Sequence, residues 1–305
     1  MAGLNMNMNM NMNMNMNMAA SGSSVGGTGT RVRFNTMDYR KYVKLPTPTT
    51  TESIIPTSTI NLRFPAYWDA DLRSYEYLHE FLGGTKTVTG VTGFPDWHDK
   101  LPPTINLQPP HQRSQAQLIP EVLKMLDVAL DRDDRFAEII DQNDADGAIS
   151  YFLGMLMIDP NRMPAAYLLV RVARRIGEHI VMSLKGEFRC PRPSQLCTAL
   201  VPMIDPPATP SFPSGHSLQA RLIATCLQAA APIGLPLHLL DDLACRIGWN
   251  RVIAGLHYPA DHVAGAAIGD WIYNSLLSTL PATSKFQKLL TAAKADLAHA
   301  SSDAP

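Results

Sequence analysis

The sequence lacks an excess of charge of either sign. Its 305 residues contain 26 Lys plus Arg against 27 Asp plus Glu, a formal net charge of −1. Proteins that bind nucleic acid normally carry a basic surface that neutralises phosphates, and this balance provides none. We therefore expect no nucleic acid among the partners of this protein.

Cysteine is scarce as well. The four cysteines form no CxxC pair, and no histidine stands at a zinc-site spacing from them. Disulfide frameworks stabilise chains much shorter than this one. We interpret all four as buried or free thiols and expect no metal site.

Long apolar runs and a secretory signal are also missing. Outside the N-terminal tail, the longest uncharged run, Leu222 to Leu240, contains a glutamine, a histidine and two prolines, so it predicts two helices rather than a membrane span. The first 30 residues show no basic segment followed by an apolar one. Because no signal is seen, we expect a soluble, cytoplasmic protein with no transmembrane segment, and export stays an open alternative.

Low-complexity and irregular sequence fills the N-terminal part. Residues 1–30 consist of an Asn-Met alternation followed by a Gly/Ser/Thr stretch, which predicts a disordered tail. Residues 31–120 are rich in Pro, Thr and aromatic residues, with short candidate strands such as Thr87–Val91. We predict an irregular segment that wraps the rest of the protein.

Helical spacing begins at Leu118, which is followed by Val122, Leu126 and Leu130. We predict that this helix begins after Pro120. Further helices are expected over about 148–157, 163–184, 215–232, 236–255 and 260–280. The fold class is therefore all-α, with a catalytic domain at 121–285 and a C-terminal tail at 286–305 that forms an exposed, fraying helix.

The acidic stretch Asp141–Gly147 has some features of a calcium-binding loop. Placing Gly147 at the sixth loop position puts Gln142 at the first and Leu153 at the twelfth, where Asp and Glu are required. We interpret the stretch as a polar turn that caps the next helix.

Three short segments carry side chains suited to chemistry on an oxyanion. Lys185, Arg192 and Arg251 are cations that could converge on one phosphate-like group, which Arg matches with a planar fork and Lys with a point charge. Pro-Ser-Gly-His opens a predicted helix, whose first N–H groups are unpaired and bind anions. Ser214 adds a hydroxyl there, and Gly215 permits close approach of the backbone.

Two histidines supply groups that titrate near neutral pH. His216 closes the Pro-Ser-Gly-His segment, and His257 follows Arg251 by six residues. Asp261, four residues beyond His257, could hold one ring nitrogen and leave the other free to attack. Each feature alone is weak. Together, and in this order, they indicate a site for phosphoryl chemistry.

The pattern Lys-x6-Arg-Pro, Pro-Ser-Gly-His and Arg-x5-His resembles the type 2 phosphatidic acid phosphatase (PAP2)/vanadium haloperoxidase superfamily. The resemblance covers residues 185–265 closely and 148–280 as a helical bundle, and it implies a fold of that type. One position departs from the family pattern. Asn250 stands directly before Arg251, where the family usually has Ser, and this affects how Arg251 is positioned.

The resemblance implies a role for each residue. His257 is expected to be the nucleophile that forms a phosphohistidine, or the vanadate ligand in a haloperoxidase. His216 is expected to act as general acid and then as base, and Asp261 to orient His257. The expected phosphate or vanadate ligands are Lys185, Arg192, Ser214, Gly215 and Arg251.

Two enzymatic functions fit this site. The first is a metal-independent phosphomonoesterase of the acid-phosphatase type, which needs no cofactor and acts on a small phosphorylated substrate. The alternative is a haloperoxidase that binds vanadate in the same pocket. The His257-Tyr-Pro-Ala-Asp continuation, the short chain and the single aromatic residue Phe188 between Lys185 and Arg192 favour the phosphatase. A catalytically idle member is disfavoured, because every expected catalytic side chain is present. Substrate identity and oligomeric state stay open.

The other aromatic and histidine side chains are interpreted structurally. Trp249 and Trp271 are expected in the core, and Trp97 and His98 in a surface loop. No role is assigned to the remaining histidines, which are His79, His111, His179, His238, His262 and His299.

Overall fold

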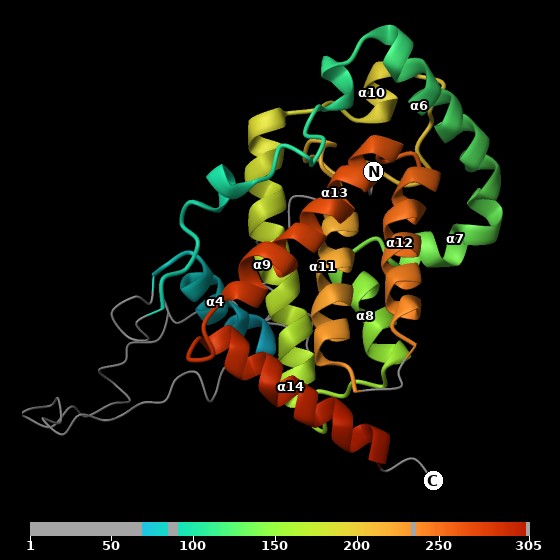
Figure 1. Ribbon diagram of the computed structural model, residues 1–305. Helices are drawn as coiled ribbons and strands as arrows, with labels where there is room; N and C mark the ends of the chain where they lie inside the picture. Colours follow the sequence, from blue (N-terminus) through green and yellow to red (C-terminus); the bar gives the residue numbers. More distant parts are fainter. Residues whose placement is uncertain (1–68, 85–90, 233–235, 303–305) are drawn as a thin grey trace, which may run out of the picture. The chain divides into compact units, whose positions relative to one another are not determined.

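A computed structural model describes residues 69–84, 91–232 and 236–302 (Figure 1). All regular secondary structure in these ranges is helical, which confirms the all-α fold class. The α-helices are α4 (Ala70–Phe81), α6 (Gln115–Val128), α7 (Arg132–Asp141), α8 (Ala145–Met155), α9 (Pro164–Phe188), α10 (Pro193–Leu196), α11 (Gly215–Ala230), α12 (His238–Ile253), α13 (Pro259–Trp271) and α14 (Lys285–Ser302). Short 3-10 turns are η2 (Trp97–Lys100), η3 (Pro110–Gln112), η4 (Ala129–Asp131) and η6 (Leu277–Thr279), and η5 (Ile272–Leu276) is a π-helix.

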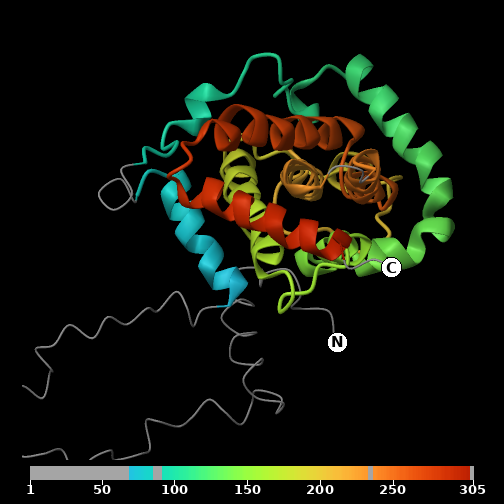
Figure 2. The same ribbon diagram turned by 60° about the horizontal axis from the view of Figure 1, so that its bottom comes forward.

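Helix α11 lies at the centre of the bundle and packs against α9, α12 and α13 (Figures 1 and 2). It begins at Gly215 because the Ser214 side chain caps it, accepting a hydrogen bond from Ser217 N. Buried apolar residues such as Leu218 and Leu222 follow at helical spacing. The Pro-Ser-Gly-His segment is therefore fixed at the start of the central helix.

Helices α11 and α13 approach closely where α13 has glycine. A Cβ atom on Gly265 would lie 2.5 Å from the Ser214 carbonyl oxygen, and one on Gly269 would lie 2.7 Å from the Leu218 carbonyl oxygen. Only glycine fits at these two positions without moving a backbone. This contact brings the start of α13, which carries Asp261, beside the start of α11.

Helix α9 runs to Phe188, four residues further than the predicted 184. Lys185 therefore lies on its last turn rather than in a loop. At the other end, Asp296 of α14 accepts hydrogen bonds from the backbone N–H groups of Ala165 and Ala166, at 2.7 and 3.1 Å. The carboxylate stabilises the positive start of α9.

The prediction of an exposed C-terminal helix over 286–305 is wrong. Helix α14 begins at Lys285 and packs against α9, with Phe286, Leu290, Ala293 and Leu297 buried. These side chains recur at three- and four-residue spacing and form one apolar face. The helix belongs to the bundle rather than to a tail.

The irregular segment predicted over 31–120 contains a helix. Helix α4 is capped by Asp69, whose side chain accepts from Leu72 N at 2.9 Å, and it packs against α9. Trp97 is 5% exposed and lies in the core, so the prediction of a surface loop is wrong for this residue. The His98 side chain is half exposed. The Pro- and Thr-rich composition of the segment concealed both features. The predicted tail at 1–30 and most of the candidate strand Thr87–Val91 lie outside the described residues.

Helices α6 and α7 form an arm around the outside of α12 (Figure 2). Helix α6 begins at Gln115 rather than after Pro120, because Ser114 and Gln117 form a capping box before the proline. Arg132 Nε donates to the Ile253 carbonyl oxygen at 2.9 Å and holds the arm to the end of α12. After the arm, Asp144 caps α8 by accepting from Gly147 N at 2.6 Å, which confirms the polar-turn interpretation.

The uncharged run from Leu222 to Leu240 divides as predicted, with α11 ending at Ala230 and α12 beginning at His238. Trp271 is buried, as predicted, and Trp249 is partly buried against the core. Among the described residues, no helix has both the length and the apolar character required to cross a membrane.

The glycine contact between α11 and α13 yields a stability prediction. Gly265→Ala forces a methyl group against a backbone oxygen, so we expect it to lower the free energy of unfolding by roughly 1–3 kcal/mol. The control is Gly154→Ala in α8, where nothing lies within 4 Å of the added atom and alanine favours the helix by up to about 1 kcal/mol. Urea denaturation of both variants measures the difference. Equal stabilities would contradict the packing argument.

Candidate active site

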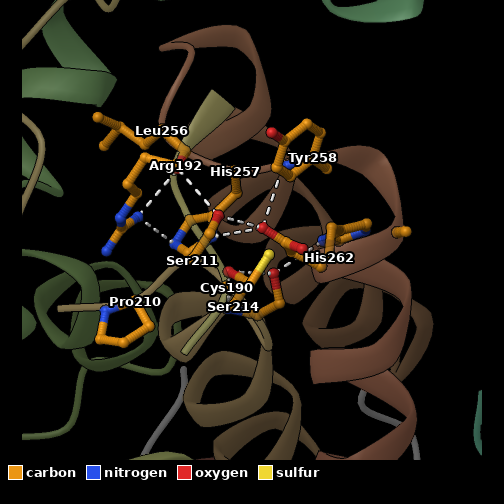
Figure 3. Close-up of polar contacts among 12 residues, drawn as sticks. Cys190, Arg192, Pro210, Ser211, Ser214, Leu256, His257, Tyr258 and His262 are labelled. Carbon is orange, nitrogen blue, oxygen red and sulfur yellow. Dashed lines mark hydrogen bonds and ion pairs between the residues drawn. The ribbon is translucent and has the colours of Figure 1, made fainter. Parts of the chain in front are cut away.

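Two of the predicted site residues, Arg192 and Ser214, lie near His257 in the close-up of Figure 3, and Asp261 is hydrogen-bonded to the His257 ring. His257 lies between α12 and α13, after a sharp turn at Gly255, whose φ of +80° favours glycine. The ring is 4% exposed. The turn places it next to Arg192, Ser211 and Asp261.

The hydrogen-bond partners of His257 define which ring nitrogen carries the lone pair and which carries the proton. Arg192 Nη1 lies 3.1 Å from His257 Nε2, and because a guanidinium can only donate, Nε2 is the acceptor and carries a lone pair. Nδ1 then holds the proton and donates it to Asp261 Oδ2 at 3.1 Å. The arrangement agrees with the predicted orienting role of Asp261.

Ser211 is a member of this group that sequence reasoning missed. Its hydroxyl donates to Asp261 Oδ2 at 2.5 Å and lies 3.4 Å from His257 Nδ1. Tyr258 N donates to the same carboxylate oxygen at 3.1 Å. Ser211 stands three residues before Ser214 in a Ser-Phe-Pro-Ser stretch, which was the available but weak signal.

Asp261 is fully buried, and burial raises the pKa of its carboxyl group. Hydrogen bonds from Ser211 and Tyr258, and the charges of Lys185 and Arg192, act in the opposite direction. Asp261 Oδ1 is buried and has no hydrogen-bond partner among the described residues. The interactions of this carboxylate are thus concentrated on Oδ2, the oxygen that orients His257.

Arg192 is held in place by the segment before α11 and by the turn before His257. Its Nε and Nη2 donate to the backbone oxygen and the hydroxyl of Thr209 at 3.0 and 3.1 Å, and Nη1 donates to the Leu256 carbonyl oxygen at 2.9 Å. Burial lowers the pKa of Arg192 to about 10, so the guanidinium stays charged at neutral pH. Sequence analysis did not identify Thr209.

Lys185 is the second buried cation. Its Nζ donates to the carbonyl oxygens of Pro210 and Ser211, the latter at 3.0 Å. Burial and the nearby charge of Arg192 hold the pKa of Lys185 well below its ordinary value. The amine therefore faces the same region as Arg192 and Asp261.

Arg251, the third cation, is only 1% exposed and has unused donors. Its Nη2 donates to the Ile139 carbonyl oxygen at 2.8 Å. Its Nε and Nη1 are buried and have no partner within the described part of the chain. Unsatisfied buried donors on a charged group are costly, so this is where a bound anion would supply the missing acceptors.

The start of α11 carries Ser214 and Gly215, from which the sequence predicts hydroxyl and backbone donors. Ser214 is fully buried, and its N–H donates to the Asp261 carbonyl oxygen at 3.0 Å. A Cβ on Gly215 would meet only Val181, at 3.8 Å or more, so protein packing does not require glycine there. Close approach of a ligand to the backbone is a consistent reason for it.

His262, to which the sequence assigned no role, extends this network. Its Nδ1 lies 2.9 Å from Ser217 Oγ, which in turn donates to Ser214 Oγ at 2.9 Å. Burial lowers the pKa of His262, which keeps the ring neutral. The ring therefore acts through Ser217 on the orientation of the Ser214 hydroxyl.

His216, on the first turn of α11, contacts the end of α7. Its Nε2 lies 2.8 Å from the Gln142 carbonyl oxygen, which can only accept, so Nε2 carries a proton. Burial, followed by the charge of Arg251, lowers the pKa of His216 to about 3, and the hydrogen bond to Gln142 acts in the opposite direction. Gln142 was predicted only as part of a polar turn.

Asn250 also contacts α7. Its amide nitrogen donates to Glu138 Oε2 at 3.0 Å and to Gln142 Oε1 at 2.9 Å. Glu138 forms an ion pair with Arg246, whose hydrogen bond lowers the pKa of Glu138 to about 2. Asn250 thus binds α7, and the end of α7 in turn contacts Arg251 and His216.

Electrostatics keeps both candidate catalytic histidines neutral in the unliganded protein. Burial and the charges of Arg192 and Lys185 hold the pKa of His257 well below its ordinary value. Arg251 contributes in the same direction to both rings. A neutral ring with its lone pair on Nε2 is the form of a histidine that can attack phosphorus.

Within the described ranges, no three His, Cys, Asp or Glu side chains cluster closely enough to hold a metal ion. A surface cavity of about 480 Å³ adjoins the site and is lined by Arg192, Thr209, Gln195 and several prolines. It lies on the side of Arg192 formed by the segment between α10 and α11.

Comparison with known proteins identifies phosphatases. A decaprenylphosphoryl-5-phosphoribose phosphatase of Mycobacterium tuberculosis is 28% identical over 103 residues, which cover 34% of this chain and 55% of that protein. A lipid A 1-phosphatase of Rhizobium etli is 40% identical over 72 residues, 23% of this chain and 28% of the relative. The chain thus spans about half the length of the first relative and less of the second.

A solved structure of a transmembrane PAP2 type phosphatidylglycerolphosphate phosphatase from Bacillus subtilis matches with 16% identity and a TM-score of 0.29, covering 68% of this chain and 87% of that one. Nothing about the fold follows from a score this low. The match to the family model is the informative one. Residues 165–279 match the model of the PAP2 superfamily, and they include every candidate site residue that the sequence predicted. This part of the chain is a PAP2 superfamily domain.

Proposed function

We propose that the protein is a phosphatase that hydrolyses a phosphomonoester through a phosphohistidine on His257. The observation that carries the proposal is the tautomer of His257, whose Nε2 lone pair lies beside Arg192 while Nδ1 is bonded to Asp261. The phosphatases among the relatives support the reaction class. For the whole protein, activity and substrate are inferences from this site and these relatives.

The proposed reaction has two steps, in which His257 is the nucleophile and His216 is first the acid and then the base. His257 Nε2 attacks phosphorus, the P–O bond to the alcohol breaks, and the departing oxygen takes a proton from His216. His216, now neutral, then takes a proton from a water molecule whose oxygen attacks the phosphohistidine. The P–N bond breaks, and inorganic phosphate and free His257 result.

The three buried cations account for stabilisation of the transition state. Phosphoryl transfer depends mainly on positioning and on neutralising charge on the equatorial oxygens. Among the described residues, Arg251 retains two buried nitrogens without a partner, and Lys185 and Arg192 donate to backbone carbonyl oxygens. Binding of the anion is expected to draw Arg192 Nη1 from the Nε2 lone pair to a phosphate oxygen. With three cations present, we propose that no metal ion or cofactor takes part.

The substrate is proposed to be a small phosphorylated molecule whose organic part reaches the cavity beside Arg192. That cavity mixes proline faces with the polar side chains of Ser194, Gln195 and Thr209. Such a lining suits a group with both apolar and hydrogen-bonding parts. The cytoplasmic location expected from the sequence stays a prediction.

Replacing the nucleophile is the first test of the proposal. We expect His257→Ala to lower turnover of p-nitrophenyl phosphate by at least about 10⁴-fold, because the lone pair that attacks phosphorus is lost. Lys185→Ala removes one cation of three, and we expect a smaller loss of about 10²–10³-fold. Acid-labile, base-stable labelling of the wild type by a ³²P-phosphoester should be absent from His257→Ala. Labelling that persists in this variant would place the nucleophile elsewhere.

Vanadate separates the phosphatase from the haloperoxidase alternative. Vanadate adopts a five-coordinate geometry like that of the transferring phosphoryl group, so we expect it to inhibit more strongly than phosphate. We also expect no bromide oxidation by peroxide in the presence of vanadate, and unchanged phosphatase turnover after dialysis against EDTA. Bromide oxidation without phosphatase turnover would favour the alternative, and loss of activity after EDTA treatment would contradict metal independence.

The pH dependence follows from the lowered pKa of His216. The protonated fraction of a group falls tenfold for each pH unit above its pKa, so donation to a poor leaving group weakens as pH rises. His257 stays neutral over this range because its pKa is held well below the ordinary value. We therefore expect kcat/KM for phenyl phosphate to be higher at pH 5 than at pH 7.

p-Nitrophenyl phosphate, whose leaving group needs no proton, is the matched control and should show a weaker dependence. His216→Ala should lower phenyl phosphate turnover by about 10²–10⁴-fold and remove the fall with pH. Parallel profiles for the two substrates would exclude His216 as the acid.

A further inference from the structure

The end of helix α7 contacts two site residues, although it lies outside the matched family region at 165–279. The Ile139 carbonyl oxygen accepts from Arg251 Nη2, and the Gln142 carbonyl oxygen accepts from His216 Nε2, each at 2.8 Å. These contacts join the arm formed by α6 and α7 to the site. No sequence motif predicts these two contacts, because both acceptors are backbone atoms.

Both acceptors belong to the C-terminal end of a helix. Helix α7 ends at Asp141, with Gln142 as its C-cap. The last carbonyl groups of a helix have no partner within the helix, and they carry the partial negative charge of the helix dipole. The arm therefore brings negative potential to a site that otherwise holds three buried cations.

Asn250 attaches this helix end to α12. A carboxamide nitrogen has two hydrogens, and Asn250 uses its amide for Glu138 Oε2 at 3.0 Å and Gln142 Oε1 at 2.9 Å. A serine hydroxyl, the usual group at this position in the resembling family, has one hydrogen and a shorter reach. Asparagine is thus the side chain that can hold both acceptors of α7 at once.

We propose that the end of α7, attached through Asn250, positions His216 as the general acid of the proposed phosphatase reaction. The Gln142 carbonyl keeps one proton on Nε2 and stabilises the doubly protonated ring. Nδ1 makes no hydrogen bond within the described part of the chain, and it is the nitrogen that delivers the second proton to the leaving group. Asn250 and Gln142 are positioning residues in this scheme, since neither contacts the reacting atoms.

The charged groups around His216 make this contribution necessary. Arg251 on α12, Lys185 on α9 and Arg192 before α10 all lower its pKa, and His257 lies in the same field. Arg174 of α9 lines the same small hollow as His216. The hydrogen bond to Gln142 is the described interaction that favours the protonated ring, so its removal should make a weak acid donor weaker still.

The test uses full-length Asn250→Ser, the matched variant Gln142→Leu and the control Lys124→Ala. Lys124 lies on the same arm in an exposed pair with Asp127, away from the site. We expect both site-side variants to lose about tenfold or more in kcat/KM for phenyl phosphate at pH 7, and much less for p-nitrophenyl phosphate. Their phenyl phosphate profiles should move to lower pH, with Lys124→Ala unchanged.

A second measurement does not require turnover. In protein labelled with ¹⁵N-histidine, we expect the neutral His216 ring of the wild type to give the chemical shifts of the Nε2–H tautomer. Asn250→Ser and Gln142→Leu should shift this signal toward a mixture of tautomers, while melting temperature reports whether each variant is folded.

The outcomes separate this inference from the proposed function. Unchanged ¹⁵N shifts in both folded variants, or equal losses with both substrates, would overturn the positioning role of α7. If the variants change the His216 tautomer but the wild-type protein hydrolyses no phosphoester, the contact with α7 is supported and the phosphatase proposal is overturned. If the two variants unfold, Glu138→Gln replaces them. This variant keeps a side-chain carbonyl oxygen as acceptor for Asn250, so the His216 ¹⁵N shifts must stay at their wild-type values. A changed shift in Glu138→Gln would contradict the scheme.

Discussion

The burial of three cations with little countercharge is the constraint on which the site depends. Lys185, Arg192 and Arg251 are each at most 4% exposed, and none forms an ion pair with a carboxylate of the described residues. Isolated buried charges cost several kcal/mol each, on the order of what a small domain has in total stability. Backbone carbonyl oxygens take the place of the missing carboxylates. They come from the segment before α11, from the turn before His257 and from the end of α7, so these loops are arranged around the cations. A bound phosphate dianion would complete the same compensation.

The two histidines have different functions in the proposed reaction, although the same cations act on both rings. Both rings lie in the same positive field, and both have a lowered pKa. His257 is oriented by the carboxylate of Asp261, which keeps a lone pair on Nε2. His216 has a neutral carbonyl partner instead, which keeps a proton on Nε2. In the proposed reaction, hydrogen-bond partners of different charge thus suit one histidine to be the nucleophile and the other to be the acid.

The sequence predicted the clustered side chains well, because residue type and spacing carry that information. Lys185, Arg192 and Arg251 were expected near the start of α11, and they lie there together with His257 and Asp261. The sequence did not predict how the cations are satisfied, since carbonyl oxygens are present at every residue and leave no signal. Gln142 was missed for the same reason. Ser211 was missed because Asp261, the partner of its hydroxyl, is 50 residues away in the sequence.

The errors in the fold came from composition. Proline and threonine around α4 suggested irregular structure, yet the local cap at Asp69 and the packing against α9 stabilise a helix. Similarly, the Lys- and Ala-rich C-terminus suggested an exposed helix, although its apolar residues form one face that covers α9. In both cases tertiary contact decided the structure, and a single segment contains little information about its neighbour.

The last two turns of α12 show how closely fold and site are joined. A Cβ on Gly248 would lie 2.5 Å from both His262 Nδ1 and Ser217 Oγ, so glycine leaves room for the network that orients Ser214. Trp249 packs edge-on against His262, with 5.5 Å between ring centroids. Asn250 binds α7, and Arg251 faces the site. Because successive helical residues point about 100° apart, these four neighbours contact α11 and α13 as well as the end of α7. This stretch from Gly248 to Arg251 is therefore a packing junction as well as the source of Arg251, a proposed phosphate ligand, and we expect a substitution in it to affect both.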